Sequence, residues 1–186
     1  DEFEYLMEIG SGRSGTVYVA CYRNELVAVK QLRIEIATYP QILQFIAEMQ
    51  LTASLTHPNV IRCEGLIFDS CRLSMVMEYA EAGSLRDVLS MNPFLDWRGS
   101  KRTFAIEIAK GMDFLHSRKK TVIHRDLKTL NVLVNEWNVV KLSDFGESRI
   151  YNKSENRFSR EENATNEDDG LRAFDNGNTN ATMQAG

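Results

Sequence analysis

The chain has 186 residues, of which 43% are apolar and 26% are charged, and its formal net charge is −4. These values are typical of a soluble globular protein with one medium domain or two small packed lobes. The slightly acidic balance argues against a nucleic-acid-binding surface, which requires a basic patch.

The ends, the cysteines and the apolar runs indicate where the chain resides. No apolar run approaches the roughly 18–20 residues needed to span a bilayer, and the acidic residues 1–4 exclude a signal peptide. The chain begins without Met, which indicates an excerpt from a longer protein. Its three cysteines form no CxxC or Cys/His cluster, so no disulfide or zinc site is expected. Cys63 and Cys71 stand in apolar, strand-like surroundings and are predicted to be buried thiols in the cytoplasm.

The first 80 residues are predicted to form a sheet of about five strands with one helix. A polar turn at 23–25 joins two runs of β-branched and apolar residues. A helix follows, because Pro40 suits a first helical turn and apolar residues in 42–53 recur at three- and four-residue steps. Residues 57–59 end this segment. The clearest predicted strands are 16–20, 26–30, 60–67 and 73–79.

After Gly83 the chain is predicted to be mainly helical. Ser84 is a good N-cap for a short helix that runs through Leu89, and Asp96 is expected to cap a longer one. Two short strands, 132–134 and 139–142, flank a polar turn. The longer helix carries an apolar stripe formed by Phe104, Ala105, Ile108, Ala109, Met112 and Leu115.

The last segment, residues 152–186, differs in composition from the rest. It contains seven Asn, four basic residues and seven acidic residues, which gives a net charge of −3. Such a segment is too polar to build a core, so an acidic, Asn-rich disordered tail is expected.

Residues 10–15 read GSGRSG and match the pattern GxGxxG. A dinucleotide-binding fingerprint requires a helix directly after these glycines, but here a strand follows. A strand–turn–strand flap of this kind lowers its backbone N–H groups onto phosphates, since glycine has no Cβ to hold it away. Taken alone, the pattern also fits an ordinary glycine-rich turn.

Lys30 and Glu48 are predicted to form an ion pair. Lys30 ends an apolar strand, where a lysine at a strand end also fits a side chain that reaches solvent along its stem. Glu48, however, falls inside the inward-facing stripe of its helix, where a charge is costly unless it is paired. Such a pair would either point the ammonium at a phosphate or serve as a plain structural salt bridge.

Residues 124–131 read HRDLKTLN, and residues 144–146 read DFG. On one loop, Asp126 can accept a hydroxyl proton, Asn131 can coordinate a hard cation, and Lys128 adds positive charge for a migrating phosphoryl group. Asp144 follows a strand and precedes a glycine, which makes it a natural magnesium ligand. Each motif alone fits a polar loop, but their order along the chain indicates one site.

Together these motifs resemble those of eukaryotic-type protein kinase catalytic domains, from about Tyr5 to Arg149. The resemblance implies an α+β, two-lobed fold. Residues 1–80 would form a β-rich N-lobe with one helix. Residues 81–151 would form a partial, helical C-lobe that holds the catalytic loop and the DFG motif.

The resemblance also implies a binding site for ATP. Lys30, braced by Glu48, would hold the α- and β-phosphates, and Ser84 would lie near the ribose. The adenine would lie between Val17, Ala28 and Leu133. Met77 resembles the gatekeeper, and Glu78 and Ala80 would contribute hinge contacts. The flap over the phosphates would comprise Ile9, Gly10, Ser11, Gly12, Arg13, Ser14 and Gly15.

For catalysis, the resemblance implies that Asp126 is the base, that Asn131 and Asp144 hold Mg²⁺, and that Lys128 assists transfer. Lys128 in this loop resembles serine/threonine kinases, so the expected reaction moves the γ-phosphoryl group of ATP to serine or threonine hydroxyls of a protein substrate. The surrounding residues resemble the tyrosine-kinase-like group, near Raf and mixed-lineage kinases. Nucleic acid and a membrane segment are not expected as partners, whereas regulatory domains in the parent protein are.

Arg125 resembles the arginine of kinases whose activation loop is ordered by phosphorylation. Nothing in the sequence chooses among the possible phosphorylation sites, and for each of them the sequence favours an ordinary solvated loop. Those sites are Tyr151, Ser154, Ser159 and Thr165.

The sequence departs from the kinase pattern in three ways, one of which is that residues 147–149 lead directly into the acidic, Asn-rich tail. No Ala-Pro-Glu motif follows the DFG motif, and the later helices are absent, so an exposed apolar patch is expected on 105–115. Thr52 stands where the family usually has a bulky apolar residue, which weakens the expected contact with Phe145. An ATP-binding scaffold or inactive fragment without the substrate-binding half, a structural interaction domain and a small-molecule kinase therefore remain alternatives.

Overall fold

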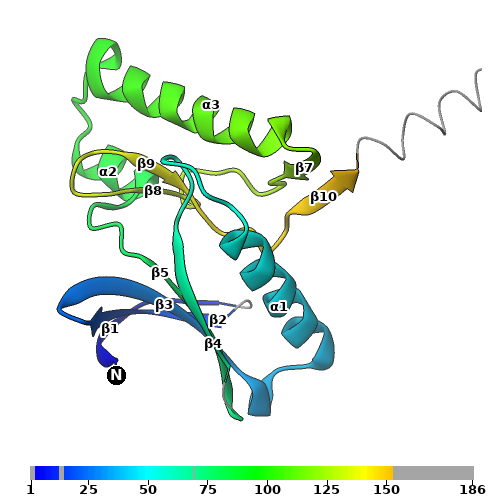
Figure 1. Ribbon diagram of the computed structural model, residues 1–186. Coiled ribbons are helices and arrows are strands. Elements are labelled where there is room, and N and C mark those ends of the chain that lie inside the picture. The colour runs from blue at the N-terminus through cyan, green and yellow to red at the C-terminus, as the bar shows by residue number, and fades with distance from the viewer. Residues whose placement is uncertain (1–2, 13–14, 69, 153–186) are drawn as a thin grey trace, which may run out of the picture.

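The computed structural model describes residues 3–12, 15–68 and 70–152, and within them a five-stranded antiparallel sheet lies beside a mainly helical part (Figure 1). This arrangement confirms the α+β class. The strand order of the large sheet is β1-β2-β3-β5-β4. Its strands are β1 (Glu4–Gly12), β2 (Gly15–Tyr22), β3 (Glu25–Arg33), β4 (Cys63–Phe68) and β5 (Arg72–Glu78).

The turn between β2 and β3 follows from its two central residues. Arg23 and Asn24 have φ values of 52° and 65°, and Tyr22 pairs with Glu25 across the turn. A two-residue hairpin with both φ angles positive matches the right-handed twist of its strands, and asparagine tolerates this conformation. The predicted polar turn is confirmed.

Helix α1 (Tyr39–Ala53) covers one face of the large sheet (Figure 1), after the 3₁₀ turn η1 (Ile34–Ile36). The helix begins as predicted, with Pro40 in its first turn, and the Thr38 N–H donates to the Gln41 side chain at 2.8 Å. The apolar face of α1 packs on the sheet through a buried cluster of Leu32, Phe45, Met49, Leu73 and Met75.

Strand β4 begins at Cys63, three residues later than the predicted start at residue 60. Val60 and Ile61 are fully buried but serve the other part of the molecule. The Ile61 N–H donates to the Leu142 carbonyl, and the Leu142 N–H donates to the Asn59 carbonyl, both at 2.9 Å. These bonds join the segment after α1 to the mainly helical part of the fold. The predicted start at residue 60 was therefore wrong, because the apolar character of Val60 and Ile61 does not show which part of the fold they join.

The second part of the fold combines helices with short strands. In it, β6, β8 and β9 form one small sheet, and β7 pairs with β10 in another. Its elements are β6 (Gly83–Ser84), α2 (Leu85–Met91), the π-helical turn η2 (Trp97–Lys101), α3 (Arg102–Ser117), β7 (Lys120–Ile123), β8 (Val132–Val134), β9 (Val140–Leu142) and β10 (Arg149–Asn152).

One of the two predicted helix caps is confirmed and one is wrong. Ser84 caps α2, since its Oγ accepts the Asp87 N–H at 3.2 Å. The Asp96 side chain makes no capping hydrogen bond. Gly99, with φ −98° and ψ −107°, interrupts the helical path, so the long helix α3 starts only at Arg102.

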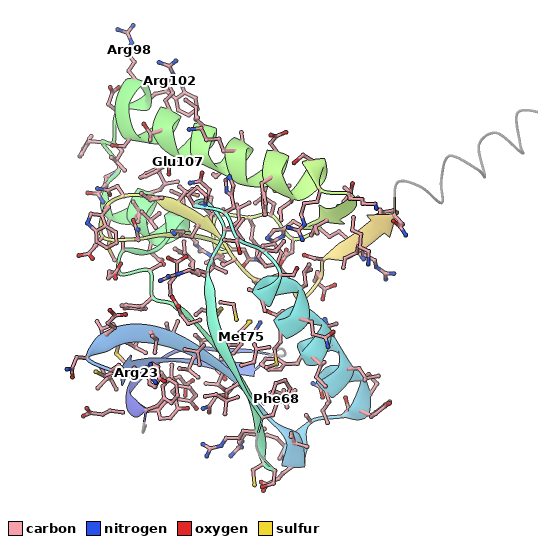
Figure 2. All side chains as sticks on the ribbon, viewed as in Figure 1. Arg23, Phe68, Met75, Arg98, Arg102 and Glu107 are labelled. Atoms are coloured by element: carbon pink, nitrogen blue, oxygen red, sulfur yellow. The ribbon has the colours of Figure 1, made fainter. Side chains whose placement is uncertain are left out.

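Helix α3 packs closely on β9. A Cβ added to Gly111 would lie 2.7 Å from Leu142 Cδ1, so the glycine allows this approach. Glu107, labelled in Figure 2, accepts the Val140 N–H at 2.7 Å on the same side. Ala105 and Ala109, predicted within the apolar stripe, are exposed, because the buried face of α3 is centred on Phe104, Gly111 and Leu115.

Two other expectations concern the cysteines and membrane insertion. Cys71 is exposed, contrary to prediction, because it lies at the edge of the turn that leads into β5, and Cys63, which was also predicted to be buried, is only half-buried. No disulfide joins Cys21, Cys63 and Cys71, all of which lie in the described ranges. Within those ranges no helix has the length and apolar character to cross a membrane. The tail predicted for residues 152–186 lies, apart from Asn152, outside the described residues.

Candidate active site

A cavity of about 640 Å³ opens between the large sheet and the mainly helical part of the fold. This volume lies within the usual range for small-molecule sites. Arg13 and Ser14 fall outside the described residues. The cavity is lined by these predicted site residues: Ile9, Gly10, Ser11, Gly12, Gly15, Val17, Ala28, Lys30, Glu48, Met77, Glu78, Ala80, Ser84, Lys128, Asn131, Leu133 and Asp144.

The flap over the cavity is the β1–β2 hairpin. Gly15 has a φ of +122°, and a Cβ there would lie 2.4 Å from the Gln31 carbonyl oxygen of β3. Only glycine fits this position without strain. Across the hairpin, the hydroxyls of Ser11 and Thr16 lie 3.2 Å apart. The backbone of the flap is therefore held close to the backbone of β3.

Lys30, on β3, meets two carboxylates from distant parts of the chain. Its Nζ donates to Glu48 Oε1 at 2.5 Å and lies 3.4 Å from Asp144 Oδ1. Lys30 and Glu48 are 6% and 3% exposed, so the pair is shielded from water, as predicted. Burial raises the pKa of Glu48, and the neighbouring ammonium opposes that rise. The strand, the helix and the DFG segment thus meet at one ammonium group.

Helix α1 also contacts the chain after Asp144. The Gln44 side chain donates to the Gly146 carbonyl at 3.0 Å, one helical turn before Glu48. Within the described part of the chain, Glu48 Oε2 stands out as the buried side-chain polar atom without a hydrogen-bond partner. A Cβ on Gly146 would lie 3.3 Å from this oxygen, so the glycine lets the segment pass close to the carboxylate.

The catalytic-loop residues converge on the Asp126 carboxylate. Asn131 Nδ2 donates to both the carbonyl oxygen and Oδ2 of Asp126 at 2.9 Å, and Lys128 Nζ donates to Oδ2 at 2.5 Å. The hydrogen bond from Lys128, supported by the one from Asn131, holds the pKa of Asp126 below its ordinary value. The same bond raises the pKa of Lys128. Asp126 is therefore ionised at neutral pH.

His124 supports this loop, although sequence reasoning gave it no role. Its ring is 1% exposed, with Nε2 3.0 Å from the Ser143 carbonyl oxygen, and its Nδ1 accepts the Asp126 N–H at 3.4 Å. The ring also lies 5.1 Å from the Phe145 ring, centroid to centroid. Through these contacts the imidazole links the loop that carries Asp126 to the segment that carries Asp144. Its position directly before Arg125 and Asp126 was the available signal.

The residues predicted to hold magnesium fit that ion chemically. Asn131 uses its amide nitrogen on Asp126, which leaves the amide oxygen as its ligand atom. The Asp144 side chain is 41% exposed and, like Asn131, lines the cavity. Over the described residues, no group of three or more His, Cys, Asp or Glu side chains could hold a metal. A cation here would therefore take its other oxygen ligands from water and phosphate, as Mg²⁺ commonly does.

The inner end of the cavity contains residues that sequence reasoning did not assign. Thr52 is 1% exposed, and its hydroxyl donates to the Glu48 carbonyl at 2.8 Å. Phe145, the contact that Thr52 was expected to weaken, is 2% exposed and packs in a cluster that includes Leu51. Ile61 and Met75 line the same end, beside Met77. No sequence motif marks these positions, because the residues become neighbours only through the packing of α1 on the sheet.

Comparisons with known proteins agree with this geometry. A family model described as "Protein kinase domain" matches residues 3–167. A probable serine/threonine-protein kinase of Dictyostelium discoideum is 40% identical over 152 residues, which cover 81% of this chain and 7% of that protein. Aurora kinase of Saccharomyces cerevisiae is 37% identical over 161 residues, covering 84% and 42%. Serine/threonine-protein kinase CTR1 of Arabidopsis thaliana is 36% identical over 145 residues, covering 77% and 18%.

The chain spans less than half the length of each of these relatives. The family model, in contrast, covers most of the chain and includes every residue of the cavity. The chain therefore belongs to the protein kinase domain family.

Proposed function

We propose that the chain carries the ATP-handling and catalytic residues of a protein serine/threonine kinase. The observation that carries this proposal is the meeting of Lys30, Glu48 and Asp144 in the same cavity that Lys128 and Asn131 line. An ammonium held between two carboxylates, one of them the partly exposed Asp144, beside an Asn amide, suits a metal-bound triphosphate better than a small neutral ligand.

The proposed reaction is in-line transfer of the γ-phosphoryl group of ATP to a hydroxyl. Lys30 would neutralise the α- and β-phosphates, and Lys128 would approach the transferred group. Asp126 would orient the hydroxyl and take its proton late, since its lowered pKa makes it a weak base. Magnesium held by Asn131 and Asp144 would offset charge on the phosphates. Positioning and charge neutralisation, which need no covalent intermediate, would supply most of the rate.

Several features support what we propose about the acceptor residues, the kinase group, the cellular compartment and the regulatory domains. Lys128 in the loop and the names of the relatives favour serine and threonine over tyrosine as acceptors. The residues from Met77 to Leu85 favour the tyrosine-kinase-like group, near Raf and mixed-lineage kinases. Three cysteines without a disulfide suit the cytoplasm. Regulatory domains in the parent protein are proposed because the chain matches only a fraction of each relative.

The competing function is an ATP-binding scaffold that transfers no phosphate. The observation that favours it is the exposed side of α3, where Ala105, Ile106 and Ala109 face solvent. Under this alternative the cavity would still take up ATP.

Transfer of radiolabelled phosphate to a generic protein substrate separates the two functions. We expect incorporation on serine or threonine by the wild-type chain and a loss of at least about a hundredfold in Asp126→Ala, since the carboxylate orients the hydroxyl. ATP-dependent thermal stabilisation should persist in that variant. Stabilisation by ATP without any transfer by the wild-type chain would favour the scaffold.

A further inference from the structure

The corner that joins α2 to α3 exposes an unusual concentration of apolar side chains. Met91, Phe94 and Trp97 are 79%, 97% and 67% exposed, and the values for Phe94 and Met91 are the two highest among the large exposed apolar residues described. Single exposed apolar residues are normal on protein surfaces, but three within seven residues form a local patch. None of them lines the nucleotide cavity.

Three basic residues stand directly beside this patch. Arg98, Lys101 and Arg102 occupy the turn before α3 and its first position, and no acidic residue lies in the first turn of α3. Figure 2 shows the side chains of Arg98 and Arg102 projecting outward from the end of the helix. Asp96 is the one acidic residue between 91 and 102. The corner is therefore basic in a chain whose net charge is −4.

This charge arrangement is unfavourable for the helix itself. The N-terminus of a helix carries a partial positive charge and prefers acidic neighbours, so three cations there oppose its dipole. Lys101, the N-cap residue, makes no side-chain capping bond either. Natural proteins break such local rules of stability mainly at functional or strained sites, and a binding surface is one kind of functional site. A partner with negative charge would offset both the cations and the dipole.

We infer that the corner formed by Met91, Phe94, Trp97, Arg98, Lys101 and Arg102 docks on an anionic membrane surface. Aromatic side chains prefer the interface between headgroups and acyl chains, and Arg and Lys bind acidic lipid headgroups. The corner projects, and its residues line neither the nucleotide cavity nor the smaller cavity beside Arg125 and Gly146. A projecting corner suits a flat lipid surface better than a peptide, which would need a groove. This inference is independent of the proposed kinase activity.

The two tryptophans of the chain, Trp97 and Trp137, allow a direct test. Trp137 is 72% exposed on the β8–β9 turn and has no cationic neighbour in sequence, so it serves as a matched control. The Trp137→Phe chain reports on Trp97 alone, and the Trp97→Phe chain reports on Trp137 alone. Each would be mixed with vesicles of phosphatidylcholine and phosphatidylserine, in a roughly four-to-one ratio, at low salt.

We expect the emission of Trp97, but not that of Trp137, to shift to shorter wavelength with these vesicles and not with pure phosphatidylcholine. Arg98→Gln with Arg102→Gln should weaken co-sedimentation with the vesicles about tenfold or more. Lys119→Gln with Lys120→Gln removes the same charge at the opposite end of α3 and should weaken it far less. Circular dichroism of each variant checks that the fold is kept.

Several results would overturn the inference. An unchanged Trp97 emission with acidic vesicles would do so, as would equal losses from the two pairs of substitutions. A shift that grows with protein concentration without vesicles would assign the corner to a second copy of the chain. An equal shift with soluble polyglutamate would assign it to an acidic polypeptide.

Discussion

The charge of Asp126 is set by its immediate neighbours. Lys128 and Asn131 both donate to Oδ2, so the carboxylate keeps its negative charge but is a weaker proton acceptor than an ordinary aspartate. This suits a residue that orients a hydroxyl and accepts its proton only when phosphoryl transfer is advanced.

The first prediction removes the main cause of that pKa shift. In Lys128→Met, the titration midpoint of the Asp126 carboxyl should rise toward its ordinary value of 3.8, since the ammonium no longer favours the ionised form. Carbon-13 NMR of the carboxyl measures this midpoint. As the pH is lowered, any activity of Lys128→Met should accordingly begin to fall at a higher pH than that of the wild type. Lys119→Met, an exposed lysine outside the loop, should leave the midpoint unchanged, and an unshifted midpoint in Lys128→Met would contradict the assignment.

At the scale of elements, the β1–β2 flap depends on glycines for two different reasons. Gly15 combines a positive φ with close contact to the β3 backbone, whereas a Cβ on Gly12 would meet nothing within 4 Å. The first glycine is therefore required by the fold, whereas the fold leaves room for a side chain at the second, where we propose that glycine lets a ligand approach the backbone.

The second prediction follows from this difference. Gly15→Ala should lower the free energy of unfolding by roughly 1–3 kcal/mol, because the methyl group forces both strain and a clash. Gly12→Ala should change it by less than about 0.5 kcal/mol but weaken ATP binding several-fold, since its methyl group separates the backbone from the phosphates. Urea unfolding and ATP titration measure the two effects. Equal destabilisation by both substitutions would contradict this account of the flap.

The end of β5 is tied to the small sheet by the side chain of Glu78. Its carboxylate accepts from Lys141 Nζ at 2.9 Å and from the Arg62 N–H at 2.7 Å. The side chains of Glu78 and Lys141 are 17% and 12% exposed, so the pair is largely shielded. It joins the hinge strand to β9 at the point where the two parts of the fold meet.

The third prediction concerns this tie. Lys141→Met should lower the free energy of unfolding by roughly 1–3 kcal/mol, because it leaves a mostly buried carboxylate without its counter-ion. Glu64→Gln breaks the exposed Arg62–Glu64 pair nearby and should cost less than about 0.5 kcal/mol. The denaturant midpoints of the two variants measure these two losses of stability. Similar midpoints would show that the Glu78–Lys141 pair contributes no more than a surface contact.

For the whole molecule, sequence patterns predicted the turns, caps and helix faces that are determined by residues close together in the chain. The 23–25 turn, the start of α1, the Ser84 cap and the inward position of Glu48 follow from propensity, capping and helical periodicity. The motif residues were predicted to share one site, and the structure brings the described ones to one cavity except Asp126, which does not line it but bonds to Lys128 and Asn131, which do. Their individual roles remain predictions, as does the lobe boundary near residue 80.

Most of the failures arise where distant segments meet. Val60 and Ile61 are as apolar as strand residues, but Ile61 and the preceding Asn59 bond to the Leu142 backbone across the molecule. Asp96 lost its predicted capping role because Gly99 redirects the chain before α3. The Glu78–Lys141 pair joins residues 63 positions apart, and no sequence pattern marks it. Tertiary packing decides the first and third cases, which local propensity does not reveal, whereas a local break at Gly99 decides the second.

The central claim is that Lys30, Glu48, Asn131 and Asp144 surround one magnesium-bound triphosphate. Calorimetric titration of the folded chain with ATP, with and without Mg²⁺, tests it most directly. We expect binding that strengthens with Mg²⁺ in the wild type, and in Asp144→Asn a loss of about tenfold or more in affinity together with most of the Mg²⁺ dependence. No nucleotide uptake by the folded wild-type chain, or unchanged Mg²⁺-dependent binding by Asp144→Asn, would contradict the claim.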